Sequence, residues 1–134
     1  LTGANLSGRG ISFYTFDGAT LTNANLSETH GQGTSFINAI MTDVDLTGAR
    51  FQNVALQRAD LTGSSLSGAT LNNVSFTGAT LIDSNFQGAS LERVSFIDAN
   101  LTRIAFGDST TITSTEFGNA EVHLTLVGVE NESK

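Results

Sequence analysis

Apolar residues recur at every fifth position along most of the chain. This column holds Leu, Ile, Met or Phe from Leu1 to Phe106, and only Gly31 interrupts it. The residue two positions before each apolar centre is usually small, most often Ala, and the other positions are mainly polar. A period of five matches neither the α-helix nor the β-strand. The pattern therefore predicts a coil that turns a corner within each repeat.

A second period, of 20 residues, indicates how many corners make one turn of the coil. Each fourth small position is alanine, and each fourth centre is Phe apart from one Leu: Ala19, Ala39, Ala59, Ala79 and Ala99, and Phe16, Phe36, Leu56, Phe76 and Phe96. Four repeats per turn place like residues above one another at the strand spacing of about 4.8 Å. The sequence thus predicts an all-β fold, a right-handed quadrilateral parallel β-helix of about six coils.

The individual repeats carry a family resemblance. Units such as Ala24-Asn25-Leu26-Ser27, Ala59-Asp60-Leu61-Thr62-Gly63 and Ala99-Asn100-Leu101-Thr102 resemble the motif A(D/N)LXX of the pentapeptide-repeat proteins. The resemblance covers residues 1–106 in one phase. It implies a solenoid that serves as a scaffold or interaction surface. Members of that family include DNA mimics directed at type II topoisomerases, cyanobacterial regulators and β-helix modules of bacterial effectors.

Towards the C-terminus the repeat changes phase. The centres after Phe106 are Ile112, Phe117 and Val122, so one residue has been inserted within 107–111. We expect one solenoid domain over 1–129, with a regular part at 1–106, a phase-shifted last coil with a cap at 107–129, and a flexible tail at 130–134. Terminal repeats need a cap because an open end exposes strand edges. A dimer interface at this end is the alternative.

Two places break the pattern and supply the candidate interaction positions. Gly31 removes one core side chain, which predicts either a local bulge filled by a neighbour or a recognition loop, with His30 facing solvent. Arg9 occupies a small inward position, where it cannot be buried unpaired. We expect a distorted terminal coil whose Phe13 and Tyr14 contact a segment upstream, or alternatively a ligand site.

Charge and composition exclude several functions. The net charge is −7, from 13 acidic and 6 basic side chains, which argues against direct binding to nucleic acid or to an anionic membrane. The sequence has no apolar run long enough to cross a bilayer and no cysteine. Two locations are therefore compatible with the sequence: the bacterial cytoplasm, or secretion as part of a larger protein.

Catalytic chemistry finds no support in the motifs. His30 and His123 are the only imidazoles, and the repeat places them several coils apart, so a two-histidine metal site is not expected. The sequence has no nucleophile elbow, phosphate-binding loop or dinucleotide motif. We therefore predict no enzymatic activity, no cofactor and no metal.

The favoured hypothesis is a non-catalytic scaffold that mediates protein–protein interaction within a larger bacterial protein, such as an effector or regulator. One alternative is a DNA mimic that binds a type II topoisomerase, which needs acidic groups spaced like phosphates. Four arginines interrupt the acids here: Arg50, Arg58, Arg93 and Arg103. The other alternative is a structural or regulatory repeat protein of cyanobacterial type. The expected partner is a protein, with no direct nucleic acid and no membrane, and the chain is a monomer or a dimer through its C-terminal end.

Overall fold

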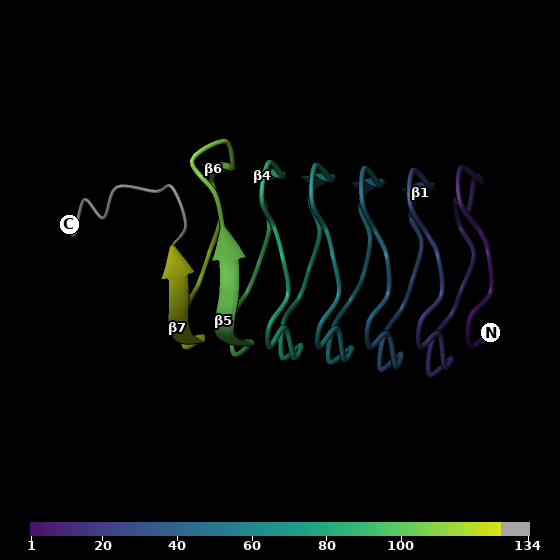
Figure 1. Ribbon diagram of the computed structural model, residues 1–134, viewed down its shortest axis with the longest axis horizontal. Helices are drawn as coiled ribbons and strands as arrows, with labels where there is room; N and C mark the ends of the chain where they lie inside the picture. The colour runs from purple at the N-terminus through teal and green to yellow at the C-terminus, as the bar shows by residue number, and fades with distance from the viewer. Residues whose placement is uncertain (127–134) are drawn as a thin grey trace.

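The computed structural model describes residues 1–126, with side chains up to Val122, as a row of coils stacked along one axis (Figure 1). The described part contains strands and turns and no helix, so no helix within it could span a membrane. The strands are β1 (His30–Gln32), β2 (Arg50–Gln52), β3 (Thr70–Asn72), β4 (Ser90–Glu92), β5 (Asn100–Phe106), β6 (Thr111–Thr113) and β7 (Glu121–Leu126). β5 pairs with β7 in a separate two-stranded sheet.

One side of the solenoid is a parallel sheet in the order β1-β2-β3-β4-β6. From β1 to β4, each residue lies opposite the one 20 positions later, so Arg50 pairs with both His30 and Thr70. A bridge from Gly10 to His30 adds a further rung, which makes six rungs with five turns of chain between the first and the last. Isolated parallel bridges, all but one with the same 20-residue spacing, link the other sides. The predicted all-β quadrilateral parallel β-helix is confirmed.

A tight turn explains why the repeat has five residues. At a representative corner, the N–H of Ser64 donates to the carbonyl oxygen of Leu61 at 3.0 Å, and Gly63 between them has a φ of 72°. A turn with positive φ at its third residue is a type II turn, which favours Gly or Asn there. The apolar centre is therefore the first residue of the turn. The small residue is the fourth residue of the turn, where it points inward and begins the next side of the coil.

Glycine at a corner also makes room for the side chain below it. A methyl group added to Gly33 would lie 2.8 Å from two carbons of the Phe13 ring, and one added to Gly78 would lie 3.2 Å from Cγ of Arg58. In both cases the covering side chain comes from the same corner of the preceding coil, 20 residues earlier. Successive coils are thus packed together on the outside as well as through the core.

The apolar column fills the interior, and its phenylalanines stack. Phe76 and Phe96 are fully buried, with ring centroids 5.2 Å apart and planes 4° from parallel. Phe117 continues the stack beyond Phe96 at 5.2 Å, while the Phe86 ring meets Phe96 edge-on. Each fully buried side chain of this size contributes about 1.5–3 kcal/mol. The core is therefore a set of columns in which like residues pack on like.

Near the C-terminus the offset between paired residues changes from 20 to 21, as the pairing of Leu91 with Ile112 shows. The extra residue falls in the loop before β6, where the Thr110 hydroxyl donates to the carbonyl of Phe86 at 2.9 Å and accepts from the N–H of Gly107 at 3.2 Å. Ile112 and Val122 are 45% and 41% exposed. The side chains from His123 onward and all of residues 127–134, where the end of the expected cap and the tail fall, lie outside the described residues.

Candidate interaction face

One side of the solenoid carries longer outward side chains than the others. In β1 and β2 the central residue is buried and its two neighbours are exposed. The register aligns these neighbours into two columns, His30–Arg50–Thr70 and Gln32–Gln52–Asn72. On the other sides the corresponding positions hold mostly Ser, Thr, Asn or Asp, whose side chains are shorter. We call the outward surface of β1 to β4 the strand face.

A groove of 340 Å³ runs across β1, β2 and β3 between the two columns. Gly31 and Phe51, the central residues of their strands, line it between the columns, and Ser12 lines it in the first coil. The Ser12 hydroxyl accepts a hydrogen bond from the backbone N–H of Gln32 at 3.0 Å, which joins the first coil to the groove. The longest exposed side chains of the lining are those of His30, Arg50, Gln32 and Gln52.

The groove is locally basic in an acidic protein. Arg50 and His30 are its only ionisable lining residues, whereas the whole chain carries −7. Among the described residues, the Arg50 guanidinium makes no ion pair and no hydrogen bond. The side-chain amides of Gln32 and Gln52 likewise have no partner in residues 1–126. These groups remain available for a bound molecule.

The strand beyond the groove, β4, carries a different arrangement. Arg93 donates from Nη2 to Oδ1 of Asn72 at 2.5 Å and lies 3.5 Å from the carboxylate of Glu92. Both Arg93 and Glu92 are about half exposed, so this ion pair adds little to stability. It holds the Asn72 amide in place and puts a carboxylate one rung beyond the groove.

Gly31 lies in a regular strand, and the expected bulge is wrong. All three residues of β1 pair in register with β2. A methyl group on Gly31 would lie 2.9 Å from Oγ1 of Thr34 and 3.3 Å from the ring of Phe51. The Phe51 ring thus occupies the space that a larger residue at position 31 would need. A neighbour fills the gap without a change in the backbone.

Because the Phe51 ring fills this space, an apolar residue at position 31 should destabilise the fold, although the repeat pattern favours one there. Gly31→Leu restores the residue that the repeat favours, yet we expect it to lower the free energy of unfolding by about 1–3 kcal/mol, because the site is already filled. Phe51→Leu in the same chain should recover most of that loss. Urea unfolding of the single and double variants measures both effects. A Gly31→Leu variant more stable than the parent would contradict the assignment of Phe51 to this space.

The first coil is not distorted, contrary to expectation. The N–H of Phe13 donates to Gln32 at 2.8 Å and that of Tyr14 to Ile11 at 3.3 Å, as in the later coils. Arg9 is exposed, since no described residue covers this end, so its charge is not buried. Phe13 and Tyr14 are 75% and 58% exposed. Whether they contact a segment upstream stays a prediction.

The structure separates the five candidate positions into two groups. His30 and Gly31 line the groove, and Phe13 follows the groove residue Ser12 at the adjoining corner. Arg9 and Tyr14 occupy inward positions at the N-terminal end and do not line it. Sequence reasoning missed Arg50, Gln32 and Gln52. The sequence pattern that indicates them is a pair of long polar residues 20 positions apart, as in His30 and Arg50 or Gln32 and Gln52.

The family is decided by the match to the model of the pentapeptide repeat region, which covers residues 11–86 and 39–117. The chain belongs to the pentapeptide-repeat family. Solved pentapeptide-repeat structures similar to this one include HetL of Nostoc sp. strain PCC 7120, which is involved in heterocyst differentiation regulation. It is 19% identical, with coverage of 90% of this chain and 87% of HetL and a TM-score of 0.45.

Two further structures are similar to this pentapeptide-repeat chain. A pentapeptide repeat protein of the cyanobacterium Cyanothece 51142 is 24% identical, with 83% and 89% coverage and a TM-score of 0.41. A trypsin-treated form of QnrB1, a plasmid-mediated fluoroquinolone resistance protein, is 19% identical, with 95% and 72% coverage and a TM-score of 0.40. No curated protein matches the chain in sequence.

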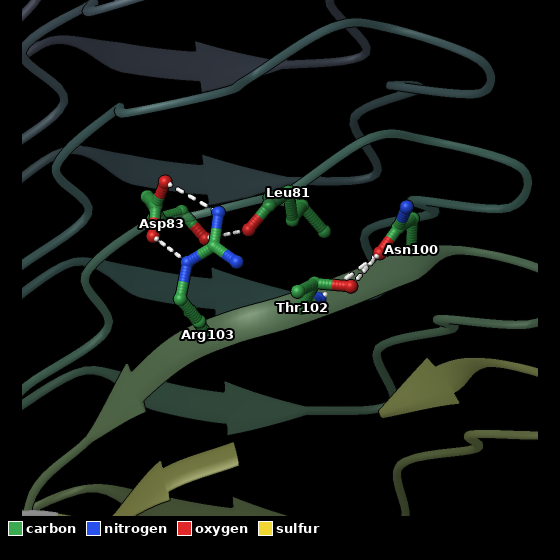
Figure 2. A network of polar contacts seen from close by, with 6 residues as sticks. Leu81, Asp83, Asn100, Thr102 and Arg103 are labelled. Carbon is green, nitrogen blue, oxygen red and sulfur yellow. Dashed lines mark hydrogen bonds and ion pairs between the residues drawn. The ribbon is translucent and has the colours of Figure 1, made fainter. Parts of the chain in front are cut away.

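Charged side chains at the corners of this pentapeptide-repeat solenoid partly neutralise one another. Figure 2 shows Arg103 of β5 reaching Asp83 at the same corner of the preceding coil. Nε lies 2.7 Å from Oδ1 and Nη2 lies 3.1 Å from Oδ2, a two-point contact. The hydrogen bonds and charge of Arg103 lower the pKa of the Asp83 carboxyl from its ordinary value of 3.8.

Arg103→Gln should raise the pKa of Asp83 towards that ordinary value. Because the folded-state pKa is depressed, the pair stabilises the fold at pH above the unfolded value, and the benefit is lost as pH falls through the folded value. An NMR titration of the carboxyl carbons measures the change. Asp17 is the internal control, since its pKa is lowered chiefly by the Ser35 hydroxyl and should not move. An unchanged Asp83 titration would refute the contact.

Within the residues that the structure describes, no three His, Cys, Asp or Glu side chains lie together in a way that could hold a metal ion. The imidazole of His30 makes no ion pair with a carboxylate there. The strand face offers hydrogen-bonding groups and the charge of Arg50 to a bound molecule.

Proposed function

We propose that this chain is a non-catalytic scaffold that binds another protein through the strand face. The observation that carries the proposal is the groove of 340 Å³, whose walls present Arg50 and the amides of Gln32 and Gln52 without internal partners. Exposed hydrogen-bonding groups that the fold itself does not use are available to a partner. The partner is neither a nucleic acid nor a membrane, because the chain carries −7.

The architecture supports this role through rigidity. The strands under the groove pair in register on both sides, and the Phe51 side chain beneath them is 2% exposed. Side chains that project from such a sheet are held at the rung spacing of about 4.8 Å. A preorganised surface loses less conformational entropy when it binds, so a groove of modest size can still be specific. Membership of a larger bacterial protein, such as an effector or regulator, remains part of the proposal.

Two ion pairs along the solenoid weigh against a DNA mimic. Asp83 is paired with Arg103 and Glu92 with Arg93, so two of the acids along the solenoid are neutralised where they stand. A surface that imitates phosphates needs unpaired charges at regular intervals. We expect no inhibition or protection of DNA gyrase in a supercoiling assay at micromolar protein. Inhibition at that concentration would favour the mimic over the scaffold.

Photo-crosslinking in cells that express the full-length protein tests the proposal. A benzophenone amino acid replaces Gln52 on the strand face or, as the control, Thr47, which is exposed on another side of the same coil. A discrete protein adduct from position 52 and none from position 47 is the expected result. Adducts from position 47 alone, or from neither position, would exclude the strand face as the binding surface.

A further inference from the structure

We propose that the groove takes an extended peptide segment with an acidic side chain, whose carboxylate is bound by Arg50. The inference rests on the proposed function, because it assigns the chemistry of the protein partner. The segment runs across β1, β2 and β3, along the axis of the solenoid. Its backbone faces the amide column Gln32–Gln52–Asn72, and its acidic side chain lies towards His30 and Arg50.

The carboxylate follows from the charges in the groove. Arg50 is exposed and has no acidic partner among the described residues, while His30 lies one rung away in register and is also exposed. A guanidinium presents a planar set of donors that matches a carboxylate in a two-point contact. The same fold already makes such a contact between Arg103 and Asp83. Arg50 is the corresponding group left open to a ligand.

The extended conformation follows from the amide column. An α-helix uses its backbone N–H and C=O groups internally, whereas an extended chain leaves them free to pair with side-chain amides. Columns two residues apart on a strand, such as those of Arg50 and Gln52, are about 6.6 Å apart, which is too close for a chain to enter between them. The segment therefore lies over the outward side chains of the two columns. Amide side chains both donate and accept, so they can pair with the alternating groups of a peptide backbone.

The far end of the groove limits where the acidic side chain can lie. The Glu92 carboxylate stands one rung beyond Asn72, and Arg93 binds both Glu92 and Asn72. A second acid near β4 would meet a carboxylate whose arginine is already engaged. An acidic side chain is therefore favoured over β1 and β2 and disfavoured beyond β3. This asymmetry gives the bound segment a preferred register.

A phage-displayed library of random dodecapeptides, panned on the intact chain, tests the inference. Selected sequences should be enriched in Asp and Glu. In fluorescence polarisation, Arg50→Gln should weaken binding of a selected peptide at least tenfold, and replacement of the peptide's acid by its amide should weaken it similarly. Arg58→Gln is the matched control, because Arg58 is exposed at a corner outside the groove and bonds to Asn38. It should leave the affinity unchanged.

Each other outcome overturns the inference in a recognisable way. Peptides without acidic enrichment that lose binding on Gln52→Ala would retain the groove as the surface and refute recognition of a carboxylate. Equal affinity for the parent chain and Arg50→Gln, in protein whose amide NMR spectrum shows an intact fold, would refute the role of Arg50. If no peptide is selected while crosslinking from position 52 succeeds, the partner is not an extended segment and the proposed function stands alone.

Discussion

Leu66→Asp should unfold the chain. Leu66 lies in the apolar column of the fourth coil and is fully buried. A carboxylate there would have no cationic partner, since the described core consists of apolar residues and a few hydroxyls. The cost of such a change exceeds about 4 kcal/mol, which is comparable with the whole free energy of unfolding of a domain of this size. Circular dichroism and urea unfolding should show loss of the cooperative transition at neutral pH.

The matched control is Ser90→Asp. Ser90 is exposed at the start of β4, and its hydroxyl makes no hydrogen bond within the described residues. The same carboxylate introduced there stays in water, so we expect a change of no more than about 0.5 kcal/mol. Equal tolerance of the two substitutions would mean that the inward and outward positions are assigned incorrectly.

Phe96→Ala should have the second largest effect. The Phe96 ring is stacked between Phe76 and Phe117, each at 5.2 Å, and meets Phe86 edge-on at 5.9 Å. Removing it leaves a cavity in the middle of the aromatic column, and such changes cost about 3–5 kcal/mol. Chemical unfolding measures the loss, and the decrease should appear in the midpoint at a nearly unchanged slope.

Phe96→Leu is the informative comparison, because Leu56 occupies the equivalent position two coils earlier and is fully buried. Leucine at position 96 keeps most of the volume and loses the stacking, so we expect about 1–2 kcal/mol. A loss as large as that of alanine would show that aromatic stacking, more than volume, stabilises this side. Phe96→Ala within 1 kcal/mol of the parent would contradict the packing described here.

The path of the chain could be predicted from the sequence because a solenoid repeats the same turn and the same pattern of burial. The five-residue period places Leu61 inward and Gly63 at a corner, and the 20-residue period aligns equivalent corners. Both are local facts about turns and burial, and each recurs many times. The inserted residue before β6 was visible for the same reason, since it shifts every later centre by one.

The errors concern packing between neighbours, which periodicity does not encode. The missing side chain of Gly31 predicted a bulge, whereas the ring of Phe51 fills the space and the strand stays regular. Arg9 predicted a distorted coil, whereas the backbone of the first coil is regular and Arg9 is exposed among the described residues. In each case the outcome depends on what lies 20 residues away or on what covers an end.

The groove was missed for a related reason. Outward residues of a repeat look interchangeable when each is judged as polar, so Gln32, Arg50 and Gln52 carried no signal individually. Their effect depends on side-chain length in two adjacent columns at once. A search of outward columns for consecutive long residues would have found the strand face without a structure.

The fixed offset of 20 residues between paired rungs constrains how such a gene can change in length. Loss or gain of a whole coil leaves every later corner on its own side, so His30 and Thr70 could still belong to one continuous groove. Loss or gain of a single five-residue repeat would rotate all the following sides by a quarter turn and divide the groove between two sides. The unit that insertion and deletion can tolerate is therefore the coil, although the motif that defines the family is the shorter repeat.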